Sequence, residues 1–330
     1  MAPNNNRPRV TNNLPADRYQ GRASFGQEPP EKDKRVVTAE DTLAKVPEVL
    51  RAMQVTHTQP RSVFYSTQLP PLDAGINPGH IRPNVKVLFG DTTVLARQLL
   101  GDRPDYRGKL AVLNCASDAE LAGRWRHRYG TTQEDALCYS STLWPELNQF
   151  KDKYPWRKVL QRDANNMGEC AGIFSPDVVI FKDELAKDCE ILRRKDWTTI
   201  SMVSVAALAC PPIVAVAQTS KRKEGAGELQ LKLEKDVRSI QERWRMTLRM
   251  AGEHGKSVLL LAALGCGVWK CPPRQVAELL QECLAEPEFE GWFEEICVGI
   301  YDKEVCRTWA EVFPETDSRV DVHQAKCVRS

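Results

Sequence analysis

The sequence has no closely paired cysteines, no Walker P-loop, no GxSxG elbow and almost no net charge. Its eleven cysteines are an odd number and stand singly, which argues against a disulfide framework and against a zinc ribbon. A reducing compartment, the cytoplasm or the nucleus, is therefore expected. Without the two motifs, an NTPase or a serine hydrolase is disfavoured.

Charge and hydropathy exclude further classes of protein. Lysine and arginine total 46 against 44 acidic residues, a net charge of +2, so no overall field would recruit nucleic acid or a membrane. The five histidines are dispersed and show no metal-ligand spacing. The N-terminus lacks an apolar signal core, and the longest uncharged stretch, residues 200–220, contains Pro211 and Pro212. We interpret that stretch as a buried strand followed by a loop.

The chain divides into three predicted parts. Residues 1–35 are rich in asparagine, proline and charge and are expected to be a disordered tail. Residues 36–84 form an accessory segment, in which Thr38 would cap a helix over 36–53 that carries Leu43, Val46 and Leu50 at helical spacing. Its later half, residues 60–83, contains five prolines and is interpreted as a surface connection.

Residues 85–330 alternate apolar strands with helical patterns. Apolar stripes predict one helix over 233–248 and a second that begins at Pro272 or Pro273. Strands are expected over residues 85–89, 110–114, 178–181, 199–208, 257–264 and 296–301. Because these runs lack polar alternation, they suit strands buried on both faces of a mostly parallel sheet. The pattern predicts a three-layer α/β sandwich.

Two adjacent acids follow the strand over 110–114. That strand ends in Asn114, a loop follows, and Gln133, Glu134 and Asp135 open a helix. Acids at a strand-to-helix junction are candidates for proton chemistry on a ligand, although first-turn acids also simply stabilise a helix dipole. The intervening residues 124–129, RWRHRY, could line a pocket for phosphates and a base or form a solvated loop. Within them, His127 is either an acid–base group or, more commonly, a surface residue.

Two other junctions could contact a ligand. Gly265, Cys266, Gly267, Val268 and Trp269 join a strand to a helix, where backbone N–H groups can approach a phosphate. A dinucleotide fold would need a third glycine, which is absent, and a tight turn without a ligand is the alternative. Asp91 follows the first strand and could cap the next helix or accept a hydrogen bond from an adenine amino group.

Taken in order, these segments resemble a known family. The segments are FGDTTVLARQL, LAVLNCAS, QEDALCYSSTLW, FSPDVVIFKD, MVSVAALACPP, LLLAALGCGVWKCPPRQVAELL and VGIYD. They are similar to the microbial-type poly(ADP-ribose) glycohydrolases over residues 85–305, with looser likeness before. The resemblance implies an α/β/α macrodomain with an N-terminal helical extension. It also implies hydrolysis of ribose–ribose bonds in poly(ADP-ribose), ADP-ribose as product, ADP-ribosylated proteins as partners, and no metal or redox cofactor.

The resemblance also implies roles for particular residues. Asp135 would be the general acid and base, with Glu134 orienting the ribose and Gln133 bracing the pair. The diphosphate loop would consist of Gly265, Cys266, Gly267, Val268 and Trp269. The remaining expected ADP-ribose contacts are Asp91, Thr92, Asn114, Ala122, Gly123 and Tyr301.

The chain departs from the family at its catalytic signature. The family has three glycines and then Gln-Glu-Glu. This chain has Leu121, Ala122 and Gly123 in place of the three glycines, and Asp135 in place of the last glutamate. Shortening Glu to Asp withdraws the carboxylate by roughly 1.5 Å, and a shift of about 1 Å can cost about a hundredfold in rate. The alternatives are therefore an enzyme in which Asp135 or Glu134 works, and an inactive ADP-ribose reader. A Rossmann oxidoreductase built on the glycine turn is a third class.

Overall fold

The predicted strands assemble into one sheet. The computed structural model describes residues 30–54, 62–127, 130–159, 170–216 and 228–314. Within these ranges seven strands form a sheet in the order β1 (Val63–Tyr65), β4 (Gly172–Ile180), β5 (Thr198–Ala206), β3 (Leu110–Ala116), β8 (Val258–Ala262), β9 (Glu295–Ile300) and β2 (Val85–Phe89). All six expected strands are confirmed, although β4 starts well before residue 178.

The sheet is mostly parallel, as the apolar runs predict. β5, β3, β8, β9 and β2 pair in parallel, and β4 is antiparallel to β5. β1 is not predicted, because it lies within the segment interpreted as a surface connection. It is only three residues long, and its pairing of Val63 with Phe174 and of Tyr65 with Gly172 is a tertiary contact that no local pattern marks.

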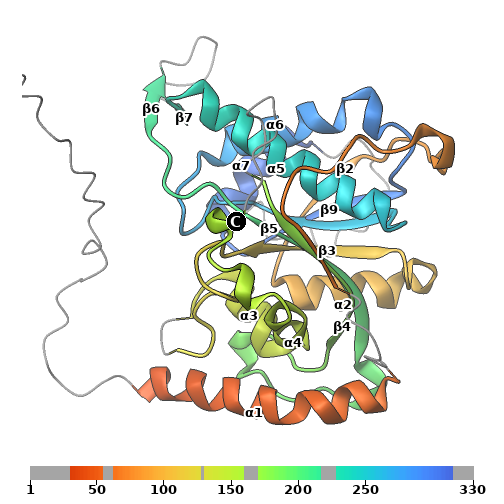
Figure 1. Cartoon of the computed structure of the whole chain (residues 1–330), viewed down its shortest axis with the longest axis vertical. Helices are drawn as coiled ribbons and strands as arrows, with labels where there is room; N and C mark the ends of the chain where they lie inside the picture. The colour runs from red at the N-terminus through yellow and green to blue at the C-terminus, as the bar shows by residue number, and fades with distance from the viewer. Residues whose placement is uncertain (1–29, 55–61, 128–129, 160–169, 217–227, 315–330) are drawn as a thin grey trace, which may run out of the picture.

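Helices cover both faces of the sheet, and alternate strand residues point to each face. Leu110 and Val112 of β3 pack with one set of helices, while Ala111 and Leu113 pack with the other. The first set is α2 (Thr92–Asp102), α3 (Gln133–Ser140) and α4 (Leu143–Asn148), and the second is α5 (Glu234–Glu253), α6 (Pro273–Leu284) and α7 (Lys303–Val312). Figure 1 shows the two sets on opposite sides of the sheet. The three-layer prediction is confirmed.

The two helices predicted from apolar stripes are confirmed. In α5, Ile240, Trp244 and Leu248 are buried, and Gly255, just after the helix, has a φ of +63°. α6 begins at Pro273, where a proline costs no hydrogen bond because first-turn N–H groups have no helical partner.

The N-terminal helix is longer than predicted. α1 (Pro30–Ala52) includes Thr38, whose hydroxyl donates to Lys34 O one turn back, so Thr38 is not the predicted cap. The expected tail therefore overlaps the helix from residue 30, and the rest of that tail lies outside the described residues. The charged stretch has no apolar stripe to indicate a helix, yet glutamate, lysine and arginine are good helix formers.

A small hairpin lies outside the main sheet. β6 (Ile213–Val216) and β7 (Glu228–Leu231) pair with each other and are not predicted from the sequence. The uncharged stretch over 200–220 forms β5, a loop and β6 as far as it is described, as the strand-and-loop interpretation requires. In the described ranges, no helix is both long and apolar enough to cross a membrane.

Candidate active site

The predicted ligand residues gather at one edge of the sheet. Because β3, β8, β9 and β2 are parallel, their carboxyl ends lie on the same side, which is where ligands bind in open α/β sheets. Asn114 lies near the end of β3, and the Gly265 to Trp269 turn follows β8. Asp91 follows β2 and Tyr301 follows β9. The connection from β3 to α3 carries Ala122, Gly123 and the acid pair.

Gln133 ties the start of α3 to β3. Its Oε1 accepts a hydrogen bond from Cys115 N at 2.8 Å, and its Nε2 donates to Leu113 O at 2.8 Å and to Thr92 Oγ1 at 3.2 Å. These three hydrogen bonds use both ends of the amide. Gln133 therefore holds the acid pair at the end of the strand, which agrees with its expected bracing role.

Asp135 closes the first turn of α3. Its Oδ1 accepts from Arg124 N at 2.9 Å, and its Oδ2 accepts from Thr132 N at 2.8 Å and from Thr132 Oγ1 at 2.7 Å. Together with the Asp135 N–H bond to Thr132 Oγ1, this is a capping box. Both carboxylate oxygens are thus occupied, and the side chain is only 1% exposed.

Glu134 is equally buried but is held by fewer donors. Its Oε1 accepts from Asn114 Nδ2 at 3.1 Å and its Oε2 from Ser117 N at 2.9 Å. Burial and, to a smaller extent, the charge of Asp135 raise the pKa of this carboxyl to about 8 despite these two hydrogen bonds. At neutral pH the group therefore keeps its proton, which a general acid requires.

Asn114 has an unmet acceptor beside this acid. The side chain is fully buried, and its Nδ2 also donates to Ser204 Oγ at 3.0 Å. Its Oδ1 is buried without a hydrogen-bond partner in the structure. An unpaired buried acceptor is costly, by about 1–3 kcal/mol, so this oxygen is a place where a ligand hydroxyl can donate.

The loop after β3 crosses directly over both acids. Ala122 and Gly123 have φ angles of 54° and 62°. A Cβ atom on Gly123 would lie 3.1 Å from Asp135 Oδ1 and 3.2 Å from Glu134 Oε2, so a side chain here would press on the carboxylates. Gly123, the one glycine kept from the three in the family signature, therefore lies where the backbone contacts the acid pair.

The glycine turn after β8 combines a strained position with an open one. Gly265 has a φ of +78°, and a Cβ there would lie 2.8 Å from Cys271 Sγ, so the turn requires glycine. At Gly267 a Cβ would meet no atom within 4 Å. The N–H groups of Gly267, Val268 and Trp269 donate to no acceptor among the described residues. Such a turn can hold an anion, whereas the Cys266 side chain is buried in the core.

Comparison with known proteins relates part of this site to a family. Residues 22–183 match the family model for the microbial-type PARG, catalytic domain. Over this region the chain is similar to the microbial-type poly(ADP-ribose) glycohydrolases. The matched region contains the acid pair, Asn114, Gly123 and Asp91, while the Gly265 turn lies beyond it. No curated protein matches the chain in sequence.

Solved glycohydrolase structures share the fold. The poly(ADP-ribose) glycohydrolase of Thermomonospora curvata, bound to the inhibitor ADP-HPD, is 20% identical over 85% of this chain and 100% of its own, with a TM-score of 0.60. The enzyme of Deinococcus radiodurans in complex with ADP-ribose is 21% identical over 87% and 98%, with a TM-score of 0.55. At these identities the likeness concerns the fold.

The residues expected on the adenine side contact other parts of the structure. Asp91 caps α2, its Oδ1 accepting from Thr93 N and Val94 N, while its Oδ2 accepts no hydrogen bond from the described residues. Tyr301 is 64% exposed and stacks on Phe89, with ring centroids 6.3 Å apart and an angle of 19°. Thr92 is buried, and its hydroxyl accepts from Gln133.

The spacer of the glycohydrolase signature is not a uniform basic pocket. Trp125 is buried and packs edge-on against Tyr139, so it belongs to the core. Arg126 lies over the Trp144 ring at 5.3 Å, and His127 is exposed. The pocket interpretation is therefore wrong for Trp125, because its large apolar ring is buried against Tyr139 and Trp144. Residues 128 and 129 of the spacer lie outside the described residues.

Three residues of the site were missed in the sequence. Ser204 pairs with Asn114 across β5 and β3, and Ser117 binds Glu134 through its backbone. A serine inside the apolar run MVSVAAL was the available signal for Ser204. The pattern predicts Phe89 only as a strand residue, because the sequence does not reveal that β2 is the last strand of the sheet. In the part of the chain that is described, no group of histidine, cysteine and acidic side chains could hold a metal ion.

Proposed function

We propose that this chain hydrolyses the ribose–ribose O-glycosidic bonds of poly(ADP-ribose) and releases ADP-ribose, with Glu134 as the general acid. The observation that carries the proposal is the buried Glu134 carboxyl, with a pKa of about 8, beside the unpaired Oδ1 of Asn114. A protonated acid next to an unmet acceptor suits a ribose whose hydroxyl donates and whose glycosidic oxygen accepts.

In the proposed step, Glu134 gives its proton to the departing ribose oxygen as the C–O bond breaks. The ribose left behind becomes oxocarbenium-like, and the nearby carboxylate of Asp135 stabilises the positive charge. Water then adds to the anomeric carbon and returns a proton to Glu134. Glu134 takes the acid role rather than Asp135, because both Asp135 oxygens are already occupied by Arg124 and Thr132.

We place the diphosphate and the adenine of the ligand along the carboxyl edge of the sheet. The diphosphate would meet the unpaired N–H groups of Gly267, Val268 and Trp269. The adenine would lie near Asp91 Oδ2 and the exposed ring of Tyr301. Because Gly123 covers both acids, substrate entry requires the turn at 121–124 to lift. Partners would be the polymer or ADP-ribosylated proteins, in the cytoplasm or nucleus, and the ten free cysteines of the described residues support a reducing compartment.

The test is release of ADP-ribose from purified poly(ADP-ribose) by wild type, Glu134→Gln and Asp135→Asn. ADP-ribose binding of each is measured by calorimetry. We expect Glu134→Gln to bind and to release no product, and Asp135→Asn to keep part of the activity. Complete loss of ADP-ribose release in Asp135→Asn, with release retained in Glu134→Gln, would show that Asp135 is the general acid. No release from wild type would overturn the glycohydrolase proposal.

A second candidate is an ADP-ribose reader without turnover. The observation in its favour is that both carboxylates are 1% exposed beneath the turn that contains Gly123. A reader would bind ADP-ribose in all three proteins and leave polymer length unchanged.

A further inference from the structure

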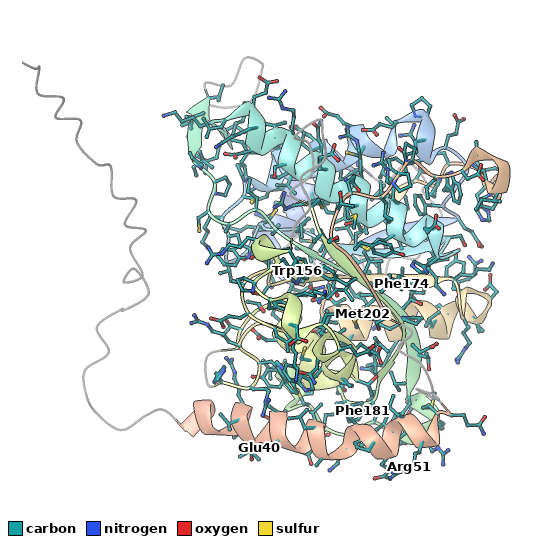
Figure 2. The ribbon with its side chains drawn as sticks, viewed as in Figure 1. Glu40, Arg51, Trp156, Phe174, Phe181 and Met202 are labelled. Carbon is teal, nitrogen blue, oxygen red and sulfur yellow. The ribbon has the colours of Figure 1, made fainter. Side chains whose placement is uncertain are left out.

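The N-terminal helix α1 packs along the layer that contains the acid-bearing helix. Ala39 is buried with the residues of α3, and Val46 and Val49 pack against Val179 and Phe181 at the end of β4. Figure 2 shows Phe181 against α1, with Arg51 on the outer side of the helix. The apolar side of α1 is therefore buried against the domain. Two polar contacts of α1 are made at or near the two ends of α3.

The first polar contact is at the carboxyl end of α3. A helix of eight residues is marginal alone, and its last carbonyl groups have no partners within the helix. Here Thr42 Oγ1 donates to Tyr139 O at 2.8 Å. Ser140 O accepts from Phe181 N and Lys182 N. The last two carbonyl groups of α3 thus accept hydrogen bonds from α1 and from the residues that follow β4.

Lys182 fixes the Thr42 hydroxyl in this role. The lysine is 1% exposed, and its Nζ donates to Thr42 Oγ1 at 2.8 Å and forms an ion pair with Asp41 Oδ2 at 2.7 Å. A third contact, to Thr38 O, is 3.4 Å long. Because the ammonium group donates to Thr42 Oγ1, the hydroxyl must direct its own proton to Tyr139 O.

The second polar contact is just before the other end of α3. Arg35 Nη1 donates to Gly130 O at 2.7 Å. Gly130 precedes the capping threonine, Thr132, by two residues, and a Cβ on Gly130 would lie 2.9 Å from the Tyr139 hydroxyl. α1 therefore holds the segment that enters α3 as well as its last turn. Between these two points lies Glu134.

We propose that α1 is a positioning element for Glu134, and that Thr42 and Arg35 act as positioning residues through α3. The inference rests on the proposed glycohydrolase function for its kinetic consequence. Neither residue belongs to the proposed ligand contacts; each fixes the backbone from which the acid projects. Since a shift of about 1 Å in a catalytic group can cost about a hundredfold in rate, loosening either contact should slow the chemistry more than it weakens binding.

The decisive comparison is Thr42→Val with Thr38→Val, in the full chain. Both remove one hydroxyl from α1, but the Thr38 hydroxyl bonds only within its own helix. For Thr42→Val we expect kcat to fall about tenfold or more, while the Kd for ADP-ribose changes less than about threefold. Thr42→Ser, which keeps the hydroxyl, should restore most of kcat. Thr38→Val should behave as wild type.

Hydrogen exchange supplies a readout that does not depend on activity. Amides of residues 133–140 should exchange about tenfold faster in Thr42→Val than in Thr38→Val, while those of α6 should not change. Equal exchange in the two variants would overturn the proposal, as would a parallel loss of kcat and affinity. If wild type releases no ADP-ribose, the glycohydrolase proposal fails, and the exchange comparison still decides whether α1 positions α3.

Arg35→Gln provides a second test should Thr42→Val not fold. Arg35 is partly exposed, and its one hydrogen bond to the described residues is to Gly130 O, so its replacement leaves the core intact. The matched control is Arg51→Gln, on the outer side of the same helix. We expect kcat to be lower in Arg35→Gln and unchanged in Arg51→Gln. Equal kcat in these two variants would contradict the proposal.

Discussion

Replacing Glu134 by glutamine should abolish a loss of stability that wild type undergoes as the pH rises. Burial raises the pKa of this carboxyl from 4.5 to about 8 in the folded protein. Between these values the folded state binds a proton that the unfolded state has released, so wild-type stability must fall with increasing pH. Each pH unit is worth about 1.4 kcal/mol, and the full decline over about 3.5 pH units is therefore on the order of 5 kcal/mol.

Glutamine is a suitable neutral substitute at this position. Its carbonyl can accept from Ser117 N, and its amide can donate to the unpaired Asn114 Oδ1 once the Asn114 amide turns over. Glu134→Gln therefore resembles the protonated acid and carries no titrating group. The charge of Glu134 also raises the pKa of Cys115 and of Tyr154, but both pKa values lie above the range tested. Within that range, the difference between the two free energies of unfolding therefore reports mainly on Glu134.

The assay is urea unfolding of wild type and Glu134→Gln across the range from about pH 5 to about pH 9. The stability of wild type relative to the variant should decline over this range and level off above about pH 8. In the same range, kcat for polymer should fall above about pH 8, as the acid loses its proton. A stability difference that stays constant within about 1 kcal/mol would refute the assignment of a raised pKa to Glu134.

Further predictions concern the capping box, the glycine turn and the aromatic pair. Asp135→Asn should lose about 1 kcal/mol of stability, because one oxygen of the capping box becomes a donor; chemical denaturation that shows no loss would contradict this. Gly265→Ala should cost about 2 kcal/mol or more, since its φ is +78° and Cys271 Sγ occupies the space. Gly267→Ala should leave stability within about 0.5 kcal/mol but weaken ADP-ribose binding about tenfold by calorimetry, and unchanged affinity would exclude this turn from the site. Tyr301→Leu should raise the Kd about threefold to tenfold, whereas Tyr301→Phe, which keeps the ring, should not.

Most of the fold could be predicted from the sequence, because the apolar patterns that mark its strands and helices lie within short segments of the chain. Runs such as 258–264 are apolar throughout, which only a strand covered on both faces tolerates, and the stripes in α5 and α6 mark their buried sides. β1, by contrast, is a three-residue strand that depends on partners far away in the sequence, among them β4, Trp156 and His254. The N-terminal limit of α1 lies in a charged stretch without an apolar stripe. Such features depend on contacts made across long stretches of chain.

By itself the sequence determined which residues stand at the carboxyl edge of the sheet. The end of each apolar run marks the end of a strand, and the residues at or after these ends are Asn114, the acid pair, the glycine turn, Asp91 and Tyr301. Only the tertiary structure decided how the two acids differ. Glu134 and Asp135 are adjacent and equally buried, yet Asp135 meets the donors of its own helix start, whereas Glu134 points at Asn114 in β3. Protonation depends on burial and on the number of donors around each oxygen, and those are set by the packing of neighbouring elements rather than by residue type.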